Sequence, residues 1–274
     1  MNLADITPGT ITAALAMISA KANEKLLLEI YGDIKKSGVN KVGHALANVL
    51  ELATGNFDLY TEKKRILRAY HLEQYRKNLE KVADDKIVEV APEVGVPIID
   101  KLEKTTNEIL SEMYINLLTN ASIEDYAGNV HPRFTQVIEN LTPDEVRIIE
   151  PLKQVNHRIP FITIIKKQEY FKKGTVRTPI AEKATEYENN NFLNMPEKSR
   201  FYFDNLEALG ILTSDMIGEN RSAYNNEYDD LMAFYPELYD FNFQLHNEVH
   251  IEKGFYQLTH FGLLFKQACQ KNPM

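Results

Sequence analysis

Apolar residues recur at helical spacing through the first half of this chain. The pattern predicts helices over residues 11–34, 42–53, 62–83 and 98–120, each with an apolar stripe. Two prolines in the segment 91–97 favour an extended connector before the fourth helix, because the residue before a proline avoids helical geometry. Four amphipathic helices joined by short links favour a helical bundle over residues 1–125.

The stretch 131–152 predicts two helices joined at a corner, with one kinked helix as the alternative. Phe134 and Ile138 share one buried face. Thr142 then fits an N-cap, Pro143 fits the first helical position, and Glu145 closes a T-x-x-E capping box. We place this joint at the start of a second domain, residues 126–274.

Beyond residue 152 the period changes. The β-branched run 159–165 suits either a strand or a compact buried turn of helix, and the polar stretch 166–191 is typical of loops. A helix from Pro196 to Gly210, a short strand, a hairpin arm over 249–258 and a terminal helix capped by Thr259 follow. The chain is therefore predicted to be mainly α, with an N-terminal helical bundle followed by a small α+β winged-helix-like C-terminal module.

Charge and cysteine content bear on the kind of partner and on the cellular compartment that we expect. The 274 residues include 39 acidic and 31 basic side chains, a net charge of −8, and the part from Thr142 onward has 19 acidic against 15 basic. This balance argues against a nucleic-acid partner, because phosphate contact needs several cations on one face. Cys269 is the single cysteine, which favours a reducing compartment. With no basic leader and an apolar run of only ten residues at 11–20, we expect a cytoplasmic protein without a transmembrane segment.

Motifs for catalysis are weak. His246 and His250 have a spacing that suits two metal ligands on one helix, but the sequence is HNEVH and the neighbouring residues look like strand, so we interpret both as surface histidines. Cys269 fits the apolar side of the terminal helix, as a small core residue. Phosphate-loop, dinucleotide-binding and nucleophile-elbow motifs do not occur. We therefore expect no catalytic residue, cofactor or metal.

An acidic, Tyr-rich insertion spans about residues 215–240. Its aromatic residues either attach the insertion to the core, the interpretation that we favour, or form an exposed contact surface for a partner. The residues that such a surface would use are Tyr224, Tyr228, Phe234, Tyr235 and Tyr239.

Several motifs, in this order, resemble the signature of the Abi-alpha (abortive infection alpha) family, a bacterial domain. They are MYxxLL at 113–118, HPxF at 131–134, LTPDE at 141–145, DNLxxLG at 204–210 and LTxxGxxFxxAC at 258–269. The resemblance as a whole covers roughly residues 40–270. The resemblance implies a role in bacterial defence against phage, in which infected cells stop supporting phage growth, and it brings no catalytic residues.

Three hypotheses for the function follow. The first is a non-enzymatic defence protein that binds a protein partner, such as a phage component. This hypothesis also allows the chain to form homo-oligomers. The alternative is a winged-helix regulator that binds DNA at a defence locus. A third and weaker hypothesis is a membrane-perturbing toxin that uses the Ala-rich segment 11–22.

Overall fold

The structure is a computed structural model that describes residues 62–170, 174–188, 191–217, 225–235 and 248–270. The helices predicted within residues 11–53 lie outside this part. The described chain divides into two compact units. Unit 1 contains the residues before Asp144 together with those from Leu264 onward, and unit 2 contains Asp144–Leu263. The predicted domain division between residues 125 and 126 stays a prediction.

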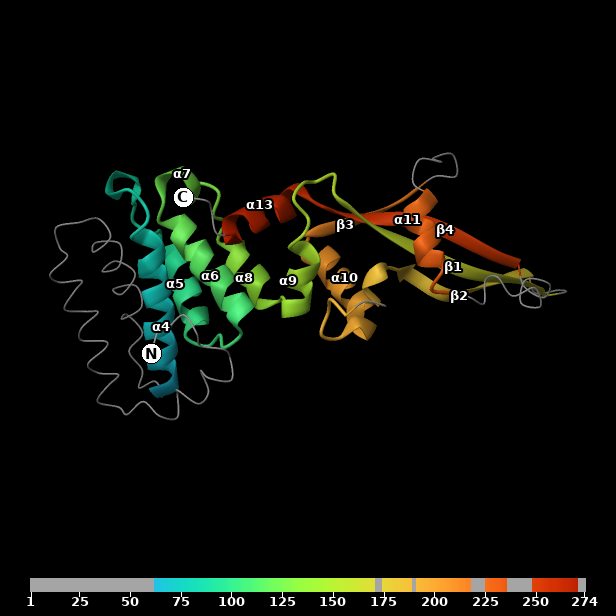
Figure 1. Ribbon diagram of the computed structural model, residues 1–274, viewed down its shortest axis with the longest axis horizontal. Coiled ribbons are helices and arrows are strands. Elements are labelled where there is room, and N and C mark those ends of the chain that lie inside the picture. Colours follow the sequence, from blue (N-terminus) through green and yellow to red (C-terminus); the bar gives the residue numbers. More distant parts are fainter. Residues whose placement is uncertain (1–61, 171–173, 189–190, 218–224, 236–247, 271–274) are drawn as a thin grey trace. The chain divides into compact units, whose positions relative to one another are not determined.

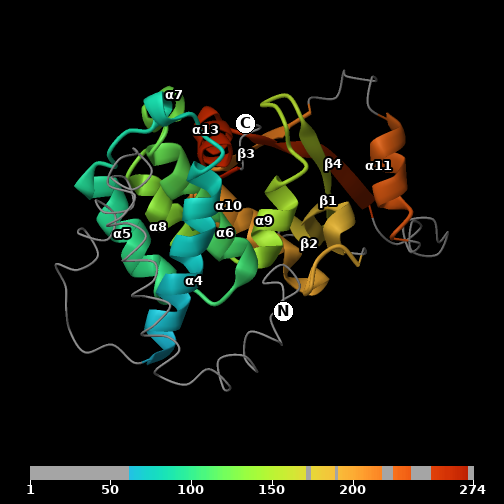
Figure 2. The same cartoon turned by 60° about the vertical axis from the view of Figure 1, so that its left-hand side comes forward.

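Unit 1 is helical where it is described. Its elements are α4 (Glu62–Leu79), η2 (Asp84–Lys86), α5 (Pro92–Leu102), α6 (Glu108–Ala121), α7 (Glu124–Ala127), α8 (Arg133–Glu139) and the last residues of α13 (His260–Cys269). Helices α4, α5, α6 and α8 lie side by side (Figure 2), and α6 contacts the other three. Their facing stripes form a core that includes Tyr75, Leu79, Ile98, Leu117 and Ile138.

Two predictions for the middle of unit 1 are wrong. The proline-containing segment forms α5 instead of an extended connector, since Pro92 occupies the first turn, where the backbone needs no donor, and Pro97 lies inside the helix. The single helix predicted over 98–120 is divided between α5 and α6. The break comes at Asn107, whose side chain caps α6 by accepting from the Leu110 amide at 3.2 Å.

The end of α13 is held by side chains of α6. Asn116 donates to the Cys269 carbonyl at 3.2 Å, and Asn120 donates to the Ala268 carbonyl at 2.8 Å. These amides satisfy carbonyls that the helix end leaves without internal partners. Cys269 is buried, which confirms its predicted place in the core, and burial raises the pKa of its thiol.

A buried polar group lies between α4 and α5. His71 is 3% exposed, and its Nδ1 atom has no hydrogen-bond partner among the described residues. Burial lowers the pKa of His71 to about 4, although a backbone hydrogen bond with Leu102 acts in the opposite direction. Arg68 of α4 and Glu103, the residue that follows α5, form an ion pair. His71 is therefore neutral in the folded chain at neutral pH.

The predicted pair of helices around residues 131–152 is confirmed. α8 ends at Glu139, and α9 (Pro143–Ile149) begins at the proline that was assigned to the first helical position. Phe134 and Ile138 are buried, as their spacing indicated.

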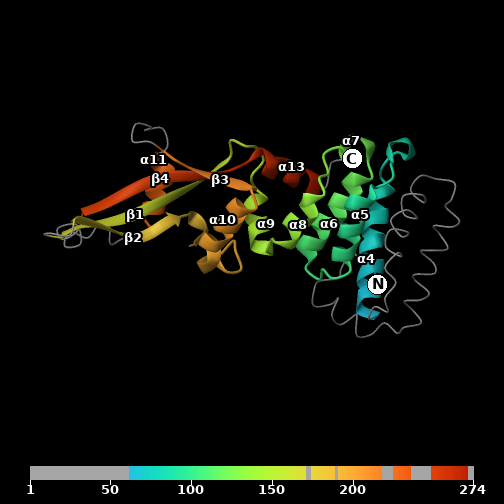
Figure 3. The same cartoon turned by 180° about the vertical axis from the view of Figure 1, so that it is seen from behind.

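Unit 2 is built on a four-stranded antiparallel sheet with the strand order β2-β1-β4-β3. The strands are β1 (Arg158–Tyr170), β2 (Gly174–Ala184), β3 (Leu212–Met216) and β4 (Glu248–Leu258). β1 and β4 run side by side for ten residue pairs, from Arg158 opposite Gln257 to Lys167 opposite Glu248 (Figures 1 and 3). Helix α10 (Ser199–Ala208), with η3 (Glu186–Glu188) and η4 (Pro196–Lys198) before it, connects β2 to β3.

This sheet contradicts the predicted fold class. The described chain is not mainly α with a small winged-helix-like module, because residues 158–170 and 174–184 form two long paired strands where the sequence indicated one short apolar segment and then loops. An N-terminal bundle is not supported either, since its first two helices lie outside the described residues. The later elements were predicted correctly, namely α10, β3, β4 and α13.

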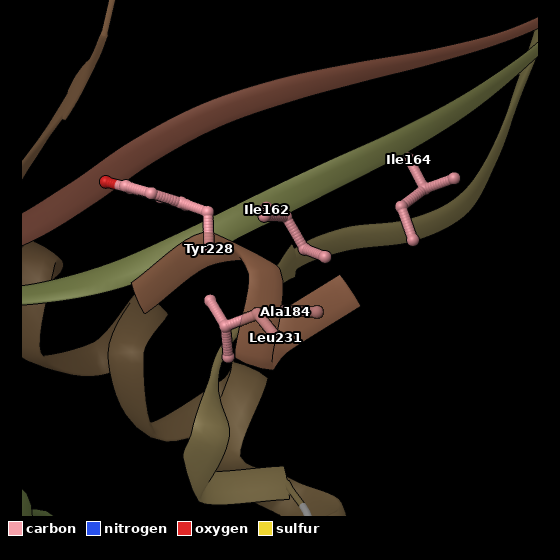
Figure 4. Packing of buried hydrophobic residues seen from close by; sticks show 5 residues of the cluster. All are labelled: Ile162, Ile164, Ala184, Tyr228 and Leu231. Carbon is pink, nitrogen blue, oxygen red and sulfur yellow. The ribbon is translucent and has the colours of Figure 1, made fainter. Parts of the chain in front are cut away.

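Part of the Tyr-rich insertion packs on the sheet through α11 (Asn225–Met232). Tyr228 and Leu231 of this helix join Ile162, Ile164 and Ala184 in one buried cluster (Figure 4). Among the described helices of the whole chain, none combines the length and the apolar character that crossing a bilayer requires.

Candidate functional site

The carboxylate of Asp144, at the start of α9, is buried and accepts five hydrogen bonds. Its Oδ1 atom accepts from the Asn194 backbone amide at 3.0 Å, the Asn194 side-chain amide at 2.9 Å and Arg147 at 2.7 Å. Its Oδ2 atom accepts from the Met195 backbone amide at 3.1 Å and the Tyr202 hydroxyl at 3.2 Å. One side chain thus fixes both α10 and the loop that precedes it.

The protonation states of this cluster follow from the same contacts. Burial alone would raise the pKa of Asp144, but the hydrogen bonds from Asn194, Met195, Tyr202 and Arg147 lower it below its ordinary value. Burial, and after it the negative charge of Asp144, raises the pKa of Tyr202 to about 12. The carboxylate therefore remains an acceptor and the phenol remains a donor at neutral pH.

The next residue along α9 makes a second buried contact with α10. Glu145 is fully buried and accepts a hydrogen bond from the side-chain amide of Asn205 at 2.6 Å. Glu145 belongs to the LTPDE motif, and Asn205 belongs to the DNLxxLG motif. These two motifs are distant in the sequence, and this hydrogen bond joins them in the fold.

The end of α10 has the backbone pattern of a Schellman cap. Gly210 adopts φ +77°, the Ile211 amide donates to the Leu206 carbonyl at 2.9 Å, and the Gly210 amide donates to the Glu207 carbonyl at 2.9 Å. The left-handed conformation at this position explains the glycine of the DNLxxLG motif.

The start of α13 contacts the residues that cap α10. Thr259 Oγ1 accepts from the Gly262 amide at 2.8 Å, which confirms its predicted capping role, and donates to the Gly210 carbonyl at 2.6 Å. A Cβ atom on Gly262 would lie 2.2 Å from the Ile211 carbonyl oxygen, so no larger residue fits there. The LTxxG motif therefore contacts the residues that follow the end of α10.

A strained residue in β2 lies beside the same helix. Lys183 has φ +49° at a bulge where the β1–β2 register shifts, and its backbone amide donates to Thr163 Oγ1 at 3.1 Å. Its ammonium group donates to Glu207 at 3.0 Å and to the Ser214 hydroxyl at 2.8 Å. Burial alone would raise the pKa of Glu207, but Ser214 and Lys183 lower it. The network is thus a charged pair that joins β2, α10 and β3.

Aromatic rings pack beside Lys183, the central residue of this network. Lys183 Nζ lies 5.3 Å from the ring centre of Tyr256 and 5.6 Å from that of Phe161. Phe203 of α10 stacks on Tyr256, with ring centres 4.4 Å apart and planes 16° apart. The inner face of α10 is therefore fixed by polar and by aromatic contacts.

Three large hydrophobic side chains in and before α10 remain exposed. Phe192 is 47% exposed, Met195 is 46% exposed and Phe201 is 63% exposed. They belong to one segment of ten residues that comprises the loop, η4 and the first turn of α10, and we call these three residues the Phe192–Phe201 surface. Asp144 holds the backbone of Met195 and the hydroxyl of Tyr202, next to Phe201. The apolar groups thus lie on a segment that hydrogen bonds to Asp144 anchor.

The five aromatic residues predicted for partner contact have different environments. Tyr228 is buried and donates to the Gly254 carbonyl at 2.8 Å, in keeping with the alternative that the insertion is attached to the core. Tyr235 is partly buried beside the same cluster, whereas Phe234 is 47% exposed. Tyr224 and Tyr239 lie outside the described residues, and a partner contact by the insertion stays a prediction.

The Phe192–Phe201 surface was not predicted from the sequence, although one signal was present. The spacing of Tyr202 and Leu206 places both on one apolar face of a helix, which leaves Phe201 as a large aromatic residue on the polar side. Asp144 was noted only as part of the LTPDE motif, since its partners at Asn194 and Met195 lie fifty residues further along the chain.

In the described part of the chain, no three His, Cys, Asp or Glu side chains gather in an arrangement that would hold a metal ion.

Comparison with known proteins indicates the family of the chain. Searches of curated proteins and of solved structures give no match. A family model described as abortive infection alpha matches residues 67–269, which is most of the chain and includes the motifs that meet at α10. The chain belongs to the abortive infection alpha family.

Proposed function

We propose that this protein acts in abortive infection by binding a protein partner, such as a phage component, through the Phe192–Phe201 surface. The observation that carries the proposal is the exposure of Phe192, Met195 and Phe201 on a segment that hydrogen bonds to the buried Asp144 carboxylate hold in place. Interfaces are enriched in aromatic residues and methionine, and their central residues supply most of the binding energy.

Rigidity of the support strengthens the proposal. A loop that is already ordered loses little conformational entropy when it binds, so more of the contact energy remains as affinity. The buried carboxylate of Asp144 orders the loop at Asn194 and Met195, and Glu145 orders α10 through Asn205.

The family supports a defence role, and phage infection is therefore the test. Cells that express the unchanged chain are compared with cells that express Phe201→Glu or Phe192→Glu, by plaque formation and by photo-crosslinking from position 198, an exposed position of the same segment, during infection. We expect both substitutions to abolish protection and the crosslinked partner, while far-UV circular dichroism and the melting temperature stay unchanged, because both side chains are exposed.

Phe234→Glu is the matched control, because Phe234 is a similarly exposed aromatic residue on the predicted insertion surface. It should retain protection. If Phe234→Glu removes protection and Phe201→Glu does not, the insertion is the contact surface. If neither substitution affects protection or crosslinking, the proposed mode of action is wrong.

A further inference from the structure

Exposed carboxylates lie on the same elements as the Phe192–Phe201 surface and on the neighbouring η3. Glu186 on η3 and Glu197 on η4 are exposed, and Asp204 on α10 has a side chain that is 52% exposed. The three elements η3, η4 and α10 contact one another, so these carboxylates lie close to the same segment. Asp204 is three residues after Phe201, which places both on the outer face of α10.

The basic residues of this region balance the carboxylates only in part. Arg200 lies 3.2 Å from Asp204 and 3.8 Å from Glu182 of β2, so its single positive charge is shared by two carboxylates and balances only one of them. Lys198 is exposed on η4. The side chain of Glu182 is 65% exposed despite the contact with Arg200, which leaves its carboxylate accessible. The rim of the surface is therefore acidic overall.

We infer that the partner presents a basic segment in which lysine or arginine residues flank an apolar anchor. This inference rests on the proposed function and adds the chemistry of the partner to it. The apolar anchor would cover Phe192, Met195 and Phe201, and the flanking cations would meet Glu186, Glu197 and Asp204. Opposite charges at the rim of an interface accelerate association and reject partners of the wrong sign.

The same charges argue against a second copy of this chain as the occupant. In a two-fold symmetric dimer the same surface patch faces itself, so the acidic rims of the two copies would be brought together. Like charges across an interface cost binding energy. A basic partner avoids this repulsion.

A display experiment with random peptides tests the inference on the full-length chain. Yeast-displayed random peptides are selected for binding to the immobilised chain, and peptides that still bind Phe201→Glu are removed. We expect the remaining peptides to be enriched in lysine and arginine next to aromatic or aliphatic residues. Their affinity should weaken by about tenfold for the double variant Glu197→Lys/Asp204→Lys, and more at low salt than at high salt.

The matched control is Glu89→Lys/Glu112→Lys, which changes the net charge equally at exposed positions of unit 1 and should leave the affinity unchanged. Phe201-dependent peptides that are neutral or acidic would overturn the basic partner and leave the proposed function standing. Sedimentation that shows a dimer lost in Phe201→Glu would instead assign the surface to a second copy, which also overturns the inference. If no selected peptide depends on Phe201, both the inference and the proposed surface are wrong.

Discussion

Replacement of Asp144 by asparagine should loosen the support of the Phe192–Phe201 surface. The substitution keeps the size of the side chain and removes its charge, while an amide offers one acceptor oxygen in place of two. With that oxygen at the Oδ1 position, the bonds from Asn194 and Arg147 can persist. The amide nitrogen then faces the Met195 amide and the Tyr202 hydroxyl.

The energetic cost follows from these five bonds. The Tyr202 hydroxyl can turn and accept from the new amide, but the Met195 amide is itself a donor and loses its acceptor. A buried donor without a partner costs about 1–3 kcal/mol. The bonds from Asn194 and Arg147 also lose their charge assistance, at roughly 1 kcal/mol in all, because bonds to charged groups are stronger than neutral ones. We therefore expect Asp144→Asn to reduce the free energy of unfolding by about 3 kcal/mol.

Urea unfolding at pH 7, followed by far-UV circular dichroism, measures this loss, since the chain contains no tryptophan for fluorescence. Because the pKa of Asp144 is lowered in the folded chain, its contribution is present above the unfolded value of about 3.9 and disappears only as pH falls through the lower folded value. Hydrogen–deuterium exchange of the peptide 191–203 reports the local effect. We expect faster exchange at the amides of Asn194 and Met195.

Asp204→Asn is the matched control. Asp204 is an exposed carboxylate on α10 that pairs with Arg200 at 3.2 Å, and exposed pairs of this kind contribute less than about 1 kcal/mol. If Asp144→Asn shifts neither the unfolding midpoint nor the exchange of peptide 191–203 beyond this control, the carboxylate does not hold the loop.

Three further substitutions test other parts of the fold. Gly262→Ala should destabilise the chain by about 3 kcal/mol, because its Cβ would clash with the Ile211 carbonyl, while Gly128→Ala, which meets no atom within 4 Å, should be neutral in thermal unfolding. The free energy of unfolding should fall by about 3 kcal/mol as the pH falls from 6.5 to 4. The pKa of His71 is about 4 in the folded chain, so over this range its imidazole binds a proton in the unfolded state and remains neutral in the folded state. His71→Gln should flatten this part of the pH profile. Lys183→Ala should be less stable than Lys183→Gly by about 1 kcal/mol in urea unfolding, because both lose the ammonium contacts and only glycine relieves the positive φ; equal midpoints would mean that the bulge is not strained.

Local signals in the sequence predicted the helix ends around α10 and α13 well. Gly210 ends α10 with a left-handed residue, and Thr259 caps α13 through the Gly262 amide, so each feature depends on residues a few positions apart. Such contacts can be inferred from spacing, because the chain itself brings the partners together.

The β1–β2 hairpin was missed because its stability comes from distant partners. Residues 166–170 and 174–178 show no alternation of apolar and polar positions, which is the usual signal of a half-buried strand. β1 pairs with β4, and Lys166 lies opposite Val249, more than eighty residues later. Long-range pairing overrides a weak local pattern, since the context of a strand decides its stability more than intrinsic propensity does.

The motif residues and the exposed residues of unit 2 have different environments. Asp144, Glu145 and Thr259 are engaged in hydrogen bonds that hold α10 in place, whereas Phe192 and Phe201 are exposed. If the motifs serve to present the surface, two kinds of inactive variant must exist. Substitutions in the motifs should remove phage protection and also speed exchange in peptide 191–203, while substitutions at the exposed residues should remove protection with exchange unchanged. A motif variant that loses protection with unchanged exchange and unfolding would place the activity in the motif residues themselves.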